Sequence, residues 1–103
     1  MAMGKQGEGN KSMARISVFG LGYVGAVSLA VLADNGHEVT GVDVNAAKVE
    51  MINRGQSPII EAGLSELIAR GVAADCIRAT TDALCAVQES DISIICVLSL
   101  IHI

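Results

Sequence analysis

The most informative stretch of the sequence is Gly20-Leu21-Gly22-Tyr23-Val24-Gly25. It follows the apolar run Ile16-Ser17-Val18-Phe19, which predicts a strand, and it opens a stretch of small apolar residues, which predicts a helix. Asp43 stands 18 residues after Gly25, at the end of a second apolar run. Three glycines in this spacing between a strand and a helix, followed by an acid at this distance, indicate a loop that binds a dinucleotide.

Each glycine of this loop has a predicted physical task. Gly20 permits a tight turn out of the strand, Gly22 lets the backbone approach a phosphate, and Gly25 lets the helix lie close to the sheet. The N–H groups at the start of that helix would then face a pyrophosphate. The alternative interpretation is a glycine-rich turn that binds no ligand.

Asp43 is expected to accept hydrogen bonds from the hydroxyls of the adenosine ribose. A carboxylate at this position repels a 2′-phosphate, so the sequence favours NAD over NADP as the cofactor. The alternatives for Asp43 are a solvated acid at a strand end and a cap for the following helix. Lys48 falls in the first turn of that helix, where it reaches the ribose or the adenine edge, although a plain surface lysine fits equally well.

The candidate cofactor-binding residues lie in this turn or just after the second strand. They are Gly20, Gly22, Tyr23, Val24, Gly25, Asp43 and Lys48. Tyr23 and Val24 are included because their backbone lies inside the loop, while ordinary packing is the alternative for Tyr23. We predict no catalytic residue and no metal site, because neither the carboxylates nor the histidines show a spacing for acid–base chemistry or metal ligation.

The hydrophobic pattern alternates strands and helices along the chain. Strands are predicted over 15–19, 38–42, 77–80 and 92–97, and helices over 23–35, 46–54, from 64 to a stop at Gly71, and over 83–88. This alternation predicts an α/β fold of the Rossmann type: a parallel sheet of order 3-2-1-4 with flanking helices, truncated after the fourth strand. The last strand would be an open edge, which predicts aggregation.

Composition narrows the class of protein further. The 103 residues are 51% hydrophobic and carry a net charge of -4, which argues against a nucleic-acid partner. Three widely spaced cysteines without a C-x-x-C pair suggest reduced thiols and a cytoplasmic protein. The late apolar stretch is too short to span a membrane. We expect a disordered tail over residues 1–14 and a nucleotide-binding half-domain over 15–97.

Several further segments resemble one family, the UDP-glucose/GDP-mannose dehydrogenases, which are nucleotide-sugar 6-dehydrogenases. The most specific is Ile52-Asn53-Arg54-Gly55-Gln56-Ser57-Pro58-Ile59-Ile60-Glu61-Ala62-Gly63-Leu64, which generic dinucleotide-binding proteins do not carry. The resemblance also covers 15–25, 36–44, 80–82 and 90–97. The residues of segments 41–44 and 57–61 are most similar to the GDP-mannose branch of the family, and the UDP-glucose branch is the near alternative.

The resemblance implies an NAD-dependent oxidation of a sugar C6 hydroxyl to a carboxylate in two steps, with two NAD reduced, in polysaccharide biosynthesis. In the full-length protein it implies a nucleotide-sugar substrate, a catalytic cysteine and a homo-oligomer. Carried over by position, Tyr23, Val24, Asp43 and Lys48 would contact NAD. Ala62 departs from the family's usual proline, and residues 98–103 replace a family turn, so we interpret them as a non-family end.

The family's catalytic cysteine and its sugar-nucleotide domain have no counterpart in these 103 residues. We therefore expect the chain to be inactive by itself and to bind NAD weakly. Two other hypotheses remain at this stage. One is another NAD-dependent dehydrogenase of the hydroxyacid type, and the other is a non-enzymatic NAD-sensing domain that needs only the glycine loop and Asp43.

Overall fold

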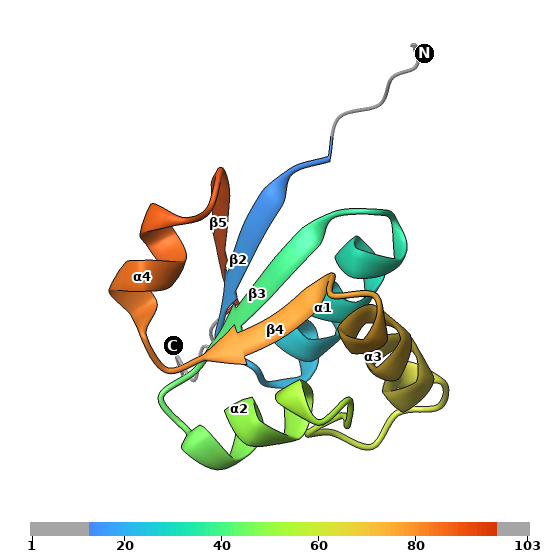
Figure 1. The fold of residues 1–103 in the computed structure, drawn as a ribbon. Coiled ribbons are helices and arrows are strands. Elements are labelled where there is room, and N and C mark those ends of the chain that lie inside the picture. Colours follow the sequence, from blue (N-terminus) through green and yellow to red (C-terminus); the bar gives the residue numbers. More distant parts are fainter. Residues whose placement is uncertain (1–12, 97–103) are drawn as a thin grey trace, which may run out of the picture.

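The computed structural model describes residues 13–96, and within them four strands and four helices follow one another, with two consecutive helices between the second and third strands (Figure 1). Their bounds are β2 (Arg15–Phe19), α1 (Tyr23–Asp34), β3 (Glu38–Val42), α2 (Ala46–Asn53), α3 (Leu64–Ala73), β4 (Ile77–Thr80), α4 (Ala83–Gln88) and β5 (Ile92–Ile95). Residues 1–12 of the predicted tail over 1–14 lie outside the described residues, and so does the predicted end over 98–103.

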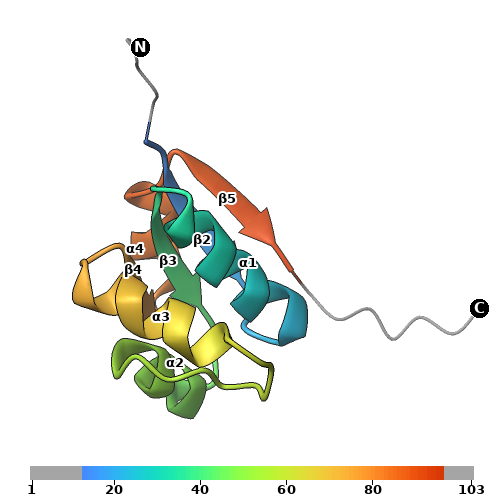
Figure 2. The same ribbon diagram turned by 90° about the vertical axis from the view of Figure 1, so that its right-hand side faces the viewer.

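The four strands form one parallel sheet in the order β4-β3-β2-β5. This confirms the predicted order 3-2-1-4. Helices α1 and α3 pack on one face of the sheet, α4 packs on β2 and β3 from the other face, and α2 lies beside β4 (Figure 2). The change of face follows from right-handed crossovers, because the chain must pass to the other side of β2 to add β5.

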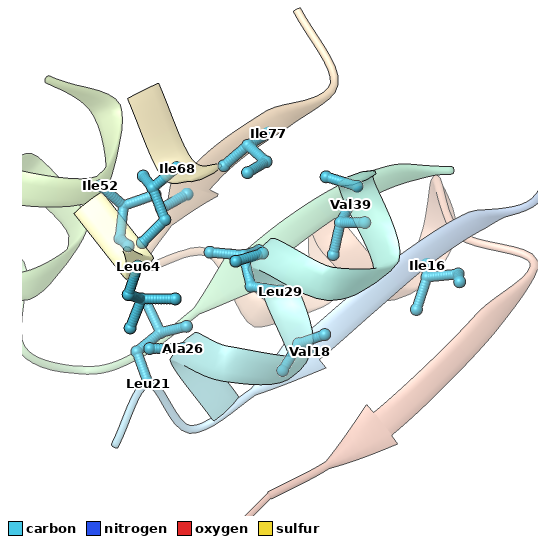
Figure 3. Close-up of a cluster of buried hydrophobic side chains, with 13 residues drawn as sticks. Ile16, Val18, Leu21, Ala26, Leu29, Val39, Ile52, Leu64, Ile68 and Ile77 are labelled. Carbon is cyan, nitrogen blue, oxygen red and sulfur yellow. The ribbon is translucent and has the colours of Figure 1, made fainter. Parts of the chain in front are cut away.

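The hydrophobic core lies between the sheet and the helices α1 and α3 (Figure 3). Val18 of β2 and Leu29 of α1 are completely buried, and each such side chain contributes about 1.5–3 kcal/mol to stability. The buried side of α1 is otherwise built from small residues, Gly25, Ala26, Ala30 and Ala33. Small side chains let α1 pack closely on β2 and β3, and α1 begins just after the carboxyl end of β2.

The opposite face of the sheet is more polar. Ser17 of β2 is fully buried there, and its hydroxyl is 2.8 Å from the hydroxyl of Ser93 on β5. This contact satisfies a buried polar group and fastens β5 to the centre of the sheet.

Helix α3 departs from the sequence prediction. Gly71 does not stop the helix, which continues to Ala73. A Cβ at Gly71 would lie 2.3 Å from Cδ1 of Ile77, so the glycine serves close packing against β4. The chain reverses instead at Asp75, whose φ of 63° is a left-handed conformation adopted without glycine. The fourth strand ends at Ile95, and Val97 lies outside the described residues.

No helix within residues 13–96 is both long enough and apolar enough to cross a bilayer.

Candidate dinucleotide-binding site

The turn between β2 and α1 is shaped by Gly20. Its φ of +96° is a conformation that side chains rarely adopt, and its N–H donates to the carbonyl of Val42 at 2.8 Å. The turn is therefore bound to the end of the neighbouring strand β3. Because parallel strands end at the same edge, the turn lies where ligands bind in sheets of this kind.

Helix α1 begins at this turn without a protein cap. Gly22 is the N-cap residue, it provides no side-chain acceptor, and the first turn of the helix contains no acidic residue. The first N–H groups of a helix need acceptors and carry partial positive charge. The arrangement suits an anionic ligand, and a Cβ at Gly22 would meet no atom within 4 Å, so the space in front is open.

Gly25 closes the turn from the other side. A Cβ at Gly25 would lie 1.7 Å from the carbonyl oxygen of Gly20 and 3.6 Å from Cβ of Cys96. The sequence predicts that this glycine allows close packing of the helix on the sheet. The structure shows that the first atoms it accommodates belong to the turn itself.

Asp43 faces this turn across the edge of the sheet. Its Oδ2 accepts a hydrogen bond from the N–H of Leu21 at 2.8 Å, and its Oδ1 accepts one from the N–H of Asn45 at 2.8 Å. One carboxylate thus joins the glycine loop to the segment that precedes α2. Asp43 does not cap α2, because Asn45 does so by accepting from the N–H groups of Ala47 and Lys48.

The charge of Asp43 is stabilised by its surroundings. Partial burial pushes the pKa of the carboxyl upward, but the N–H donors of Leu21 and Asn45 and the nearby Lys48 charge outweigh burial and hold the pKa below its usual value. The carboxylate is therefore ionised at neutral pH. Each of its oxygens has a second lone-pair site that remains available to a ligand.

An open groove extends from this carboxylate along the carboxyl ends of three strands. Its lining residues are Phe19, Gly20, Val42, Asp43, Val44, Thr81 and Ala83. The floor is mostly apolar and one wall carries the ionised acid, which suits a flat heterocycle attached to a sugar diol. The sequence prediction missed three lining residues, Phe19, Val42 and Thr81. Each stands at the end of a parallel strand or directly after it, and this position is the sequence signal that could have identified them.

The remaining predicted site residues lie at the starts of α1 and α2 and do not line this groove. Tyr23 and Val24 are exposed at the start of α1, with 58% and 61% of their surface accessible. Lys48 lies in the first turn of α2, close enough to influence the charge of Asp43. The seven candidates are therefore brought to one edge of the sheet by β2, α1, β3 and α2.

The histidine and cysteine side chains considered next lie outside this site. Among residues 13–96 no cluster of His, Cys, Asp and Glu could hold a metal ion. His37 accepts a hydrogen bond at Nδ1 from the N–H of Ala14, near the opposite end of the strands. The exposed Cys85 thiol donates to Glu89 at 3.4 Å, and this hydrogen bond raises the pKa of the thiol, which makes it a poor nucleophile.

The parallel sheet of this order, the uncapped helix start behind a glycine turn, and the acid on the neighbouring strand define an NAD-binding domain of the Rossmann type. The model of the NAD-binding domain of the UDP-glucose/GDP-mannose dehydrogenase family matches residues 14–99. The chain belongs to this family, and the resemblance inferred from the sequence is confirmed.

Individual relatives agree with this assignment. GDP-mannose 6-dehydrogenase of Azotobacter vinelandii is 55% identical over 83 residues, which are 81% of this chain and 19% of that protein. UDP-glucose 6-dehydrogenase of Rhizobium meliloti is 42% identical over the same length. The higher identity to the first agrees with the greater similarity to the GDP-mannose branch that the sequence segments indicate.

Solved structures show the same fold. A GDP-mannose dehydrogenase from Pseudomonas aeruginosa in a ternary complex superposes with a TM-score of 0.80 at 53% identity, covering 81% of this chain and 19% of that one. A UDP-glucose dehydrogenase from the archaeon Pyrobaculum islandicum superposes with a TM-score of 0.80 at 40% identity, covering 84% and 20%. The chain spans about a fifth of the length of the relatives it matches.

Proposed function

We propose that the edge of the sheet formed by the β2–α1 turn and Asp43 binds NAD. The pyrophosphate lies against the N–H groups at the start of α1, in the open space in front of Gly22. The adenosine ribose lies over Asp43, and the adenine occupies the groove beside Val44. The observation that carries this proposal is the hydrogen bond from the Leu21 N–H to Asp43, which directs the carboxylate to the turn.

The chemistry of the residues supports this fit. The two oxygens of Asp43 each accept one backbone hydrogen bond and each retain one lone-pair site, so the carboxylate can accept from the 2′- and 3′-hydroxyls of one ribose. A 2′-phosphate in that position would bring negative charge about 4 Å from the carboxylate, which costs about 4 kcal/mol for unit charges near a protein surface. The site therefore discriminates against NADP.

In the complete enzyme we propose that this domain serves the oxidation of GDP-mannose, or alternatively UDP-glucose, to the uronic acid, for polysaccharide biosynthesis in the cytoplasm. Bound NAD supplies the hydride acceptor for that reaction. The residues of this chain bind and orient the cofactor, and none of the predicted site residues is placed to activate a sugar hydroxyl.

The test compares NAD and NADP binding to the wild-type chain and to Asp43→Asn by NMR titration. The asparagine lacks the charge and has only one acceptor oxygen, so we expect NAD binding to weaken by roughly tenfold to a hundredfold, the equivalent of one hydrogen bond to a charged group. The preference for NAD over NADP should fall as well.

The matched control is Asp34→Asn, which removes the same charge at the exposed far end of α1. Its NAD affinity should equal that of the wild type. Equal NAD affinities for Asp43→Asn and the wild type would refute the assignment of Asp43 to the ribose. NAD-induced shifts confined to residues far from the β2–α1 turn would refute the location of the site.

A further inference from the structure

Gly41 lies inside the buried strand β3, where glycine is otherwise unfavourable. A glycine in a strand interior weakens the strand, so it often marks a place where another part of the chain approaches closely. Gly41 is in register with Val18 of β2 and Ala79 of β4, and residues in register face the same side of a parallel sheet. The group that approaches Gly41 on this side is the side chain of Leu21, from the β2–α1 turn.

The Leu21 side chain occupies the space that Gly41 leaves free. A Cβ at Gly41 would lie 2.8 Å from Cδ2 and 3.2 Å from Cδ1 of Leu21, and 3.5 Å from Cδ1 of Leu29. Leu21 is completely buried, and Figure 3 shows it in the core cluster with Ala26 and Leu29. Because protein interiors are closely packed, the Leu21 side chain cannot yield to a methyl group unless its neighbours or its own backbone move.

The backbone of Leu21 belongs to the candidate site. Its N–H donates to Oδ2 of Asp43 at 2.8 Å, and the N–H of Gly20 before it donates to the carbonyl of Val42 at 2.8 Å. The residue after it, Gly22, is the N-cap of α1. Leu21 therefore has its side chain in the core and its N–H on the acid, so a displacement of the side chain is passed directly to the hydrogen bond.

We propose that Gly41 is a positioning residue of the dinucleotide site. By leaving room for the Leu21 side chain, it holds the Leu21 N–H on the carboxylate of Asp43 and keeps that carboxylate in the orientation that accepts the ribose. Gly41 is itself buried, so it acts only through Leu21. The last step, acceptance of the ribose, rests on the proposed binding of NAD.

Two single variants and their combination test this arrangement. Gly41→Ala places a methyl group against the δ carbons of Leu21, which is overpacking. Leu21→Val removes those δ carbons and leaves space above Gly41. The double variant Gly41→Ala/Leu21→Val combines an added methyl group with the missing carbons. We expect each single change to disturb the turn and the double variant to restore most of its geometry, which is a non-additive result.

The first measurement needs no ligand. In the wild type the amide of residue 21 donates to an ionisable carboxylate, so its NMR chemical shift should follow the titration of Asp43. We expect this pH response to shrink, and the amide to exchange faster with solvent, in both single variants. Both properties should return in the double variant. Lys48, whose charge also acts on Asp43, is unchanged in all three variants. A wild-type pH response in folded Gly41→Ala would overturn the proposal.

The second measurement is NAD affinity at a temperature where every variant is fully folded. Binding to Gly41→Ala should weaken by about fivefold to thirtyfold, because the backbone of one residue must then be ordered when the ligand binds. The double variant should recover most of this loss. Wild-type affinity in Gly41→Ala together with weakened binding in Asp43→Asn would refute the positioning role of Gly41. Wild-type affinity in both would refute the NAD site instead, and the pH response of residue 21 would still decide whether Gly41 positions the turn.

The matched control is Gly71→Ala, which makes the same change against the end of another buried aliphatic side chain. Its added Cβ would lie 2.3 Å from Cδ1 of Ile77, on α3 and β4 and away from the turn. We expect a loss of stability with a wild-type pH response at residue 21 and wild-type NAD affinity. Equal losses of the pH response in Gly71→Ala and Gly41→Ala would show a general effect of destabilisation and would count against the proposal. Should Gly41→Ala fail to fold, unchanged pH response and amide exchange at residue 21 in Leu21→Val would refute it.

Discussion

Alanine is expected to lower stability at Gly25 and to weaken NAD binding at Gly22, although the two glycines are three residues apart in one turn. At Gly25 the added Cβ would lie 1.7 Å from the Gly20 carbonyl oxygen and 2.8 Å from its carbonyl carbon. Carbon and oxygen atoms of neighbouring chains normally approach no closer than about 3.3 Å. The turn must therefore move by more than an ångström, and the atom that is displaced belongs to the backbone.

The cost can be worked from the contacts that this movement disturbs. Overpacking in a tightly packed region costs about 1–3 kcal/mol, and loss of the Gly20 N–H bond to Val42 adds about 1 kcal/mol. We therefore expect Gly25→Ala to lower the free energy of unfolding by about 3 kcal/mol, which corresponds to a fall in Tm of roughly 10–20 °C for a domain of this size.

At Gly22 the same methyl group meets nothing within 4 Å, and the φ of −82° is accessible to alanine. The free energy of unfolding should change by no more than about 0.5 kcal/mol. The methyl would instead occupy the space assigned to the pyrophosphate, so NAD binding should weaken by at least about tenfold.

Thermal denaturation and NAD titration of both variants measure these effects. An unchanged Tm for Gly25→Ala would refute the packing argument. Wild-type NAD affinity in Gly22→Ala would refute the placement of the phosphates.

Two further outcomes concern stability alone. Asp75 adopts a left-handed φ of 63°, which is unfavourable for a residue with a side chain. We therefore expect Asp75→Gly to raise the free energy of unfolding, measured by urea denaturation, by roughly 0.5–1 kcal/mol. A lower free energy of unfolding would show that the Asp75 side chain contributes more to stability than its backbone conformation costs. The pKa of Asp43 is lower in the folded chain than the ordinary value of 3.8, so its contribution to stability is complete above that value and is lost as the pH falls through the folded pKa. The denaturation midpoint should therefore fall less between neutral and acidic pH in Asp43→Asn than in the wild type. Parallel plots of the midpoint against pH for the two proteins would contradict this.

The strand order and the position of the turn could be predicted because they depend on local signals. The Gly20–Gly25 pattern, the alternation of apolar runs and the cap residue Asn45 are each encoded within a few neighbouring residues. Right-handed crossovers then leave few ways to arrange four parallel strands. The family resemblance depends on longer contiguous segments, so it could also be recognised from the sequence.

Features that depend on distant contacts could not be predicted in this way. The sequence predicts that Gly71 ends the helix. Only the position of Ile77 on β4 shows that Gly71 lies inside the helix and leaves room for the Ile77 side chain. The double hydrogen bond between Asn53 and Ala79 joins residues 26 apart in sequence, which periodicity cannot reveal.

The bond between the Leu21 N–H and Asp43 has a consequence for how a ligand arrives. Fixing the backbone of a mobile loop costs about 1–2 kcal/mol for each residue ordered. In this chain that entropy is lost during folding, because the turn is already held at both ends by β3 and its acid. Preorganisation of this kind removes the cost of ordering the turn from the binding step, so a dinucleotide meets the turn and its acid already in place.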